Sequence, residues 1–213
     1  MEALIVSKTK MKNAVCVGAL LLDYDANIRL LNPGNRNQPE DTDFEIGQIW
    51  NLRFIKRNPI HNPHTEDRIV LEKTHVKDVE SISDFLQSRK INLTVGNPNN
   101  LFEKKLEWHS NGSGFILEKN ELPDFSVCFW KADKDLLLYS SYGKSRYRYD
   151  ENISFPYVGL VPPIQTIKKG TLIRMSLTRA FDKDKTGEKS SWLQLSGWYD
   201  LGEHSHEEDN LPF

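Results

Sequence analysis

The sequence is poor in cysteine, in long apolar runs and in net charge, and each deficit disfavours a class of protein. Only two of its 213 residues are cysteine, and Cys16 and Cys128 each lie in an apolar run typical of a buried strand. We therefore expect free core thiols in a reducing compartment rather than a disulfide framework. No apolar run approaches the ~20 residues that span a bilayer, and residues 1–6 lack the features of a secretory signal. We predict a cytoplasmic protein without a membrane partner.

The net charge of −2 argues against a protein that coats nucleic acid through bulk electrostatics. The charge is unevenly distributed, however. Residues 203–213 contain no Lys or Arg and four acidic side chains, namely Glu203, Glu207, Glu208 and Asp209. Removing these four charges from the net −2 leaves the rest of the chain at +2. Any basic groove is therefore expected to be local.

Motifs for nucleophilic or phosphate-transfer chemistry are also missing. No serine lies in a glycine-flanked elbow, and Gly143-Lys144-Ser145 lacks the preceding spaced glycine of a phosphate-binding loop. His61 and His64 have a spacing compatible with metal ligation, but no cysteine pair accompanies them. Turn chemistry explains the acidic pairs that begin at Asp133 and Asp182 more simply than Mg²⁺ binding does. We expect no enzymatic activity, cofactor or metal.

Short segments rich in aromatic and β-branched residues, separated by glycine, proline and aspartate, occupy most of the chain and predict strands. One segment differs. From Thr74 to Lys90 the apolar residues recur at helical spacing, which predicts a helix of about three to four turns. Short strands with a single helix favour barrels or sandwiches over a doubly wound sheet. The expected fold is mainly β, with one main helix around residues 75–90.

A cluster of turn-forming residues at 96–100, Gly-Asn-Pro-Asn-Asn, divides this pattern into two parts of similar size. We predict an N-terminal barrel with the helix over residues 1–95 and a C-terminal barrel over residues 101–200. Residues 201–213 are expected to form an acidic, flexible tail.

Several local patterns carry a resemblance to a known family: residues 14–19 (AVCVGA), residues 28–30 (IRL), residues 64–67 (HTED), residues 170–177 (GTLIRMSL) and, most specific, residues 192–199 (WLQLSGWY). Together they resemble the bacterial dual OB domain family, which carries two oligonucleotide/oligosaccharide-binding folds in tandem. The resemblance covers most of residues 1–200. It implies two OB-like β-barrels and nucleic-acid binding, and it associates the chain with DNA metabolism or antiphage defence. It assigns few roles to individual residues.

The last seven residues, EEDNLPF, resemble the C-terminal tip of bacterial single-stranded DNA-binding proteins. In that family the tip recruits other proteins rather than holding DNA. An aromatic ring beside the terminal carboxylate suits an apolar pocket with a basic rim. The resemblance therefore implies that a partner with such a pocket binds Asp209, Leu211, Pro212 and Phe213. A frayed polar tail is the alternative.

Aromatic and basic residues interleave between residues 139 and 149, as expected where rings stack on bases and cations contact phosphates. The candidate nucleic-acid contacts here are Tyr142, Lys144, Arg146, Tyr147 and Arg148. In a strand, Arg146 and Arg148 share one face and Tyr147 lies on the other. A turn at residue 143 would bring Tyr142 and Lys144 beside the arginines. The alternative is an ordinary strand with half-buried tyrosines and solvated arginines.

Three further candidates for nucleic-acid contact lie in the last predicted strands. Arg174 alternates with apolar neighbours and is expected to face outward. Trp192 and Trp198 would share one face of a regular strand, as a stacking surface, a core element or a partner interface. Besides the basic residues between 139 and 149, a second basic set is interpreted as solvated surface: Lys8, Lys10, Lys12, Arg29, Arg53, Lys56 and Arg57. A third set surrounds Arg174 and comprises Lys168, Lys169 and Arg179.

These features lead to a non-enzymatic protein that binds single-stranded DNA or RNA and recruits a protein partner through its acidic end. A backbone-and-stacking mode would give modest affinity, strong salt dependence and weak sequence preference. The alternative is an interaction adaptor without nucleic-acid affinity, which the near-neutral charge favours. A nuclease or nucleotide-handling enzyme is the least favoured hypothesis.

Overall fold

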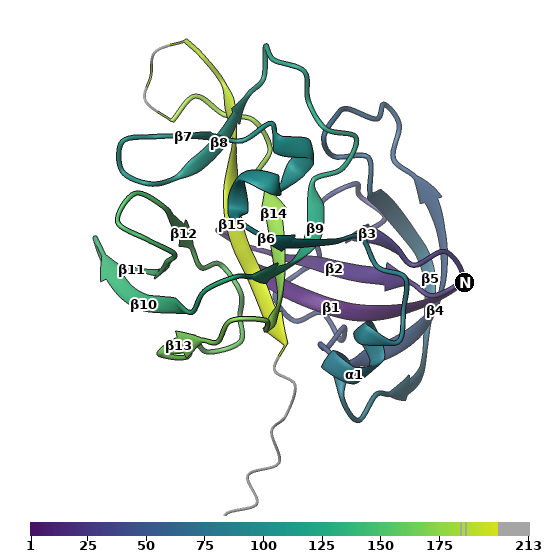
Figure 1. The fold of residues 1–213 in the computed structure, drawn as a ribbon. Coiled ribbons are helices and arrows are strands. Elements are labelled where there is room, and N and C mark those ends of the chain that lie inside the picture. The colour runs from purple at the N-terminus through teal and green to yellow at the C-terminus, as the bar shows by residue number, and fades with distance from the viewer. Residues whose placement is uncertain (184, 186, 200–213) are drawn as a thin grey trace, which may run out of the picture.

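The computed structural model describes residues 1–183, 185 and 187–199, and the fold is mainly β (Figure 1). Its elements are β1 (Glu2–Lys10), β2 (Val15–Leu21), β3 (Ala26–Leu31), β4 (Gln48–Lys56), β5 (Asp67–Asp78), α1 (Ile82–Gln87), β6 (Leu93–Gly96), η1 (Pro98–Asn100), η2 (Phe102–Lys104), β7 (Glu107–Trp108), β8 (Gly114–Leu117), β9 (Val127–Ala132), β10 (Leu136–Ser141), β11 (Lys144–Arg148), β12 (Ser154–Pro156), β13 (Thr166–Ile167), β14 (Leu172–Leu177) and β15 (Ser190–Tyr199). The predicted tail, with Asp209, Leu211, Pro212 and Phe213, lies outside the described residues.

The first five strands form a closed barrel in the order β1-β2-β3-β5-β4, with β1 pairing with β4 to close it. All pairs are antiparallel except β3–β5, which is parallel. The interior is filled by alternating residues such as Ala3, Ile5 and Leu30. This strand order and parallel closure make the barrel OB-like.

The second half has a six-stranded sheet, in the order β6-β9-β14-β15-β8-β7, and a four-stranded sheet, β12-β11-β10-β13. The two sheets enclose a second core that includes Trp130, Tyr147 and Phe155. This half is an open half-barrel and completes the predicted pair of OB-like units. β6, which lies at the predicted domain boundary, pairs in parallel with β9 of this half.

A third apolar cluster joins the two halves. Leu4 and Val6 of β1 point away from the first barrel's core and pack with Phe129, Leu172 and Tyr199 of the second half. Because β1 is buried on both faces here, its residues 3–6 (ALIV) form a continuous apolar run rather than an alternating one. Figure 1 shows β15 (yellow) running beside β1 and β2 (purple) at this junction. The halves therefore share a packed interface.

The predicted helix over residues 75–90 is much shorter than expected. α1 spans Ile82–Gln87 and is capped at its N-terminus by Ser81, whose hydroxyl accepts a hydrogen bond from Asp84 N. Residues 74–78 instead continue β5, where His75 pairs with Trp50 of β4. Backbone pairing along the barrel overrides the helical spacing of this segment. In the described part of the chain, no helix is long and apolar enough to cross a membrane.

Candidate nucleic-acid interface

The hairpin of β10 and β11 carries the main sequence candidates. Ser141 pairs with Lys144, so Tyr142 and Gly143 form a two-residue turn, with φ angles of 50° and 70°. Positive φ at both positions is characteristic of a type I′ turn, which matches the twist of the flanking strands. The Tyr142 side chain is fully exposed at the tip. The predicted turn around Gly143 is therefore present.

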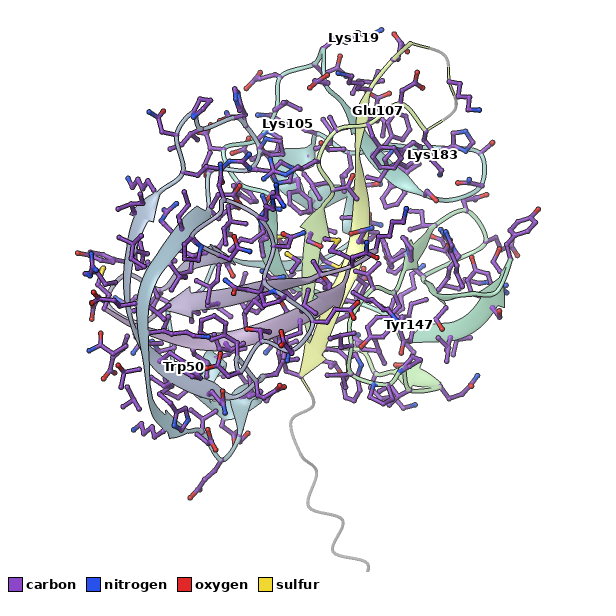
Figure 2. All side chains as sticks on the ribbon, turned by 180° about the vertical axis from the view of Figure 1, so that it is seen from behind. Trp50, Lys105, Glu107, Lys119, Tyr147 and Lys183 are labelled. Carbon is purple, nitrogen blue, oxygen red and sulfur yellow. The ribbon has the colours of Figure 1, made fainter. Side chains whose placement is uncertain are left out.

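The two faces of β11 differ as its alternation predicts. Tyr147 is completely buried in the second core, and its hydroxyl donates to Ile164 O at 2.9 Å. Figure 2 labels Tyr147 within this sheet, on the far side of the molecule from Trp50 of the first barrel. Arg148 is exposed, and its guanidinium lies 4.7 Å from the Tyr139 ring centroid. Tyr147 thus builds the core, whereas Arg148 faces solvent.

Arg146 is largely engaged by the protein itself. Its Nη2 donates to Ser113 Oγ at 3.1 Å and to Ser154 O at 3.1 Å. Its Nε donates to the Tyr139 hydroxyl at 3.1 Å. These bonds tie β11 to β12 and to the loop before β8, which gives Arg146 a structural role. The exposed set of the hairpin is therefore Tyr142, Lys144 and Arg148, with Tyr139 half-buried beneath Arg148.

The two tryptophans of β15 do not form one surface. The pairing with β14 shifts between Arg174 and Met175, which leaves Ser196 as an extra residue in β15. Such a bulge reverses the alternation beyond it. Trp198 consequently packs against the second core, whereas Trp192 is buried against Phe115, with Lys183 over its ring at 3.9 Å. Figure 2 labels Lys183, the residue over the Trp192 ring, well apart from Tyr147 of the second core. The expectation of a shared face is wrong because of this bulge.

Arg174 is also placed differently from the prediction. It faces the first barrel rather than solvent and is only 4% exposed. Its Nη1 donates to Ser196 Oγ at 3.0 Å. A Cβ added to Gly18 of β2 would lie 2.5 Å from Arg174 Nη2, so glycine at this position makes room for the guanidinium. Arg174 is therefore a buried residue at the junction of the two halves.

Asp67 organises three arginines at this junction. Its buried carboxylate accepts hydrogen bonds from Arg29 Nε at 2.5 Å, Arg57 Nη1 at 3.0 Å and Arg179 Nη2 at 2.7 Å. Burial by itself would raise the pKa of this carboxyl, but the hydrogen bonds and charge, first from Arg29, lower the pKa to about 2. Asp67 thus remains ionised and joins β3 and β5 of the first barrel to the segment after β14.

Two neighbours strengthen the same junction. The Glu66 carboxylate accepts a hydrogen bond from Ser126 Oγ at 2.9 Å across the two halves, and burial raises its pKa. His64 Nε2 lies 3.0 Å from Thr178 O. Burial, followed by the charges of Arg29 and Arg179, lowers the pKa of His64 to about 4. His64 is therefore neutral near pH 7 and donates to the carbonyl.

The fold agrees with what comparison of the sequence with known families shows. The sequence profile described as the dual OB-containing domain matches residues 1–198. The chain belongs to this family. No curated protein and no solved structure matches it.

Within this dual OB chain, sequence reasoning missed the junction. The sequence pattern predicts solvated surface for Arg29 and Arg57, yet both donate hydrogen bonds to Asp67. The HTED motif at residues 64–67 enters the sequence analysis through the resemblance and as a weak metal-site candidate, whereas all four of its residues form hydrogen bonds that bridge the halves. Two adjacent acids after a histidine were the available sequence signal. Their partners at Ser126 and Arg179 are too distant in sequence for spacing to reveal.

The two cysteines also differ from each other in this dual OB structure. Both are free thiols. Cys128 is buried in the second core, and desolvation raises the pKa of its thiol to about 12. Cys16 is only partly buried and lines a cavity between the halves. The expectation of a core position is therefore right for Cys128 and wrong for Cys16.

Proposed function

We propose that this dual OB protein is a non-enzymatic binder of single-stranded nucleic acid and that the exposed set of the β10–β11 hairpin contacts the strand. The observation that carries the proposal is Tyr142. A tyrosine at φ 50° is uncommon, because a side chain at positive φ is sterically disfavoured. Its ring is fully exposed and gains nothing from packing. Base stacking supplies a reason for an aromatic residue at this turn.

The neighbouring cations support the same function. Lys144 follows the turn, and Arg148 lies four residue pairs farther along β11, over the Tyr139 ring. A guanidinium already placed on a ring can contact a phosphate with little further loss of side-chain freedom. Two phosphate contacts on a single strand correspond to a log–log salt slope of about −1.4. The mode is therefore salt-sensitive and tolerant of sequence.

The test is fluorescence anisotropy with labelled oligo-dT and oligo-rU at low salt. Tyr142→Ala should weaken binding about tenfold, because one stacked base is worth ~1–3 kcal/mol. Arg148→Gln should weaken it and flatten the salt slope. The matched controls are Tyr24→Ala, which removes a tyrosine exposed on the first barrel, and Arg53→Gln, which removes an exposed arginine there. Equal losses in variants and controls, or no binding by the wild type, contradict the proposal.

We further propose that the acidic segment ending in Leu211-Pro212-Phe213 recruits a protein whose apolar pocket has a basic rim. The support is its composition, which combines acidic residues with an apolar aromatic end. Pulldown with the wild type and with a variant lacking Phe213 is the test. A protein retained by the wild type and lost by the variant supports recruitment. Identical captures by the two chains reject it.

An interaction adaptor without nucleic-acid affinity is the second candidate, favoured by the net charge of −2. It predicts no anisotropy change with either oligonucleotide at low salt while Phe213-dependent capture persists. The two assays together therefore separate the candidates.

A further inference from the structure

A cavity of about 370 Å³ lies between the two halves. Its walls come from β1, β2 and β3 of the first barrel and from β14, β15 and residues 126–127 of the second half. Small-molecule sites occupy ~300–1,000 Å³, so this cavity has room for one ligand of about nucleotide size. Because the second half covers this face of the first barrel, a long strand does not fit into it.

The cavity walls are cationic. Arg29, Arg174, Arg179 and Lys10 contribute to the lining, and none of the described lining residues is acidic. The nearby Asp67 carboxylate is shared among Arg29, Arg179 and Arg57. Glu66, whose charge also acts on Arg29 and Arg174, is the second carboxylate near the cavity, so two acidic groups face four arginines. A larger cavity beside α1, of about 720 Å³, has Glu80 and Asp84 in its wall and lacks this excess of positive charge.

Arg174 adds to the excess of positive charge around the cavity. It is 4% exposed, and in the described part of the chain no carboxylate lies within ion-pair distance of it. Its Nε is buried and has no hydrogen-bond partner among the described residues. A buried cation without a counter-ion is costly by several kcal/mol, so such a group indicates an anion that the protein accepts from outside. Gly18 provides the space in which the guanidinium lies.

The remaining lining suits an organic phosphate. Met11, Val127 and Leu177 provide apolar wall, while Thr178 and Gln194 provide polar groups. An apolar pocket with a few converging polar groups is the usual form of a small-molecule site. Guanidinium groups pair with phosphate through two parallel hydrogen bonds, and several of them around one site favour a doubly charged anion.

We propose that the cavity between the two halves binds a phosphate monoester of nucleotide size, with Arg29, Arg174 and Arg179 around the phosphate. The site goes beyond strand binding by the hairpin and does not depend on it. The phosphate can belong to a free nucleotide or to the phosphorylated end of a strand. Both sources present the same group to the arginines.

The experiment is calorimetric titration of the full chain with AMP, adenosine, inorganic phosphate and a short oligonucleotide with or without a 5′-phosphate. We expect one site per chain, binding by AMP or by the 5′-phosphorylated strand, and none by adenosine. Binding of AMP identifies a free nucleotide as the source, and binding of the phosphorylated strand alone identifies a strand end. Absence of binding by every phosphate probe up to about 10 mM overturns the proposal.

Arg179→Gln and Arg57→Gln form a matched pair of variants. Both remove a hydrogen bond to Asp67, but only Arg179 lines the cavity. Arg179→Gln should weaken binding about tenfold or more, since a hydrogen bond to a charged group is worth ~1.5–3 kcal/mol. Arg57→Gln should leave binding almost unchanged. Equal losses in the two variants overturn the proposal. Arg179 is half-exposed, so the test needs no substitution at the buried Arg174.

Cys16 provides a second readout, because it lines the cavity whereas Cys128 is fully buried. Bound AMP should slow alkylation of Cys16 by a small thiol reagent in the wild type and not in Arg179→Gln. Unchanged alkylation at a saturating AMP concentration places the ligand elsewhere and overturns the proposed site.

Discussion

The substitution Asp67→Asn tests how strongly the junction depends on one carboxylate. Asp67 is 2% exposed and accepts hydrogen bonds from Arg29, Arg57 and Arg179. Asparagine keeps the shape and one acceptor oxygen but removes the charge. Arg29, whose side chain is 15% exposed, then lacks a carboxylate partner at ion-pair distance among the described residues.

Two separate arguments give the expected loss in free energy of unfolding. Removing one partner of a buried ion pair costs about 3–5 kcal/mol. Independently, lowering the pKa of Asp67 from 3.8 to about 2 corresponds to about 2 kcal/mol at 1.36 kcal/mol per unit. The retained acceptor of asparagine favours the lower end, so we expect a loss of about 3 kcal/mol. With a urea m-value of ~2 kcal/mol/M, the unfolding midpoint should fall by about 1.5 M.

The pH dependence has a definite sign. The folded pKa of Asp67 is below its unfolded value, so the unfolded chain takes up the proton first as the pH falls. The stabilisation is fully present above about pH 4 and is lost as the pH falls towards 2. The difference between wild type and Asp67→Asn should therefore be large at pH 5 and small at pH 2.5.

The assay is urea unfolding followed by tryptophan fluorescence at both pH values. Glu72→Gln is the control, because Glu72 forms an exposed ion pair with Arg53, and its midpoint should match that of the wild type. A loss below about 1 kcal/mol at pH 5 refutes the reasoning, since it falls outside the range for a broken buried pair. A difference between wild type and Asp67→Asn that stays constant from pH 5 to pH 2.5 refutes it as well.

Three further predictions concern single positions. The folded pKa of His64 is lowered to about 4, so stability should fall by about 3 kcal/mol as the pH drops from 6.5 to 4, and His64→Gln should flatten this dependence in urea unfolding. Gly18→Val should cost about 1–3 kcal/mol by displacing Arg174, measured by thermal unfolding against wild type. Gly143→Ala, at φ 70°, should cost about 1 kcal/mol, whereas Tyr142→Ala should leave the melting temperature unchanged.

Local sequence patterns are sufficient to predict the mainly-β character of the chain, and the family resemblance predicts its two OB-like halves. Alternation and turn residues are local signals, and they located strands such as β10 and β11 and the turn at Gly143. The placement of Tyr147 and Arg148 on opposite faces of β11 also followed from the period of a strand, although Tyr147, a candidate nucleic-acid contact, is a core residue. These features depend on neighbours within a few residues, so the sequence contains them directly.

The length of α1, the faces of the two tryptophans and the contacts at the junction depend on the packed fold. Residues 74–78 joined β5 because β4 was available to pair with them. One extra residue, Ser196, reversed the alternation between Trp192 and Trp198. Asp67 meets Arg179 across 112 residues of sequence. Such contacts form only when distant strands close around shared cores, and therefore no local pattern specifies them.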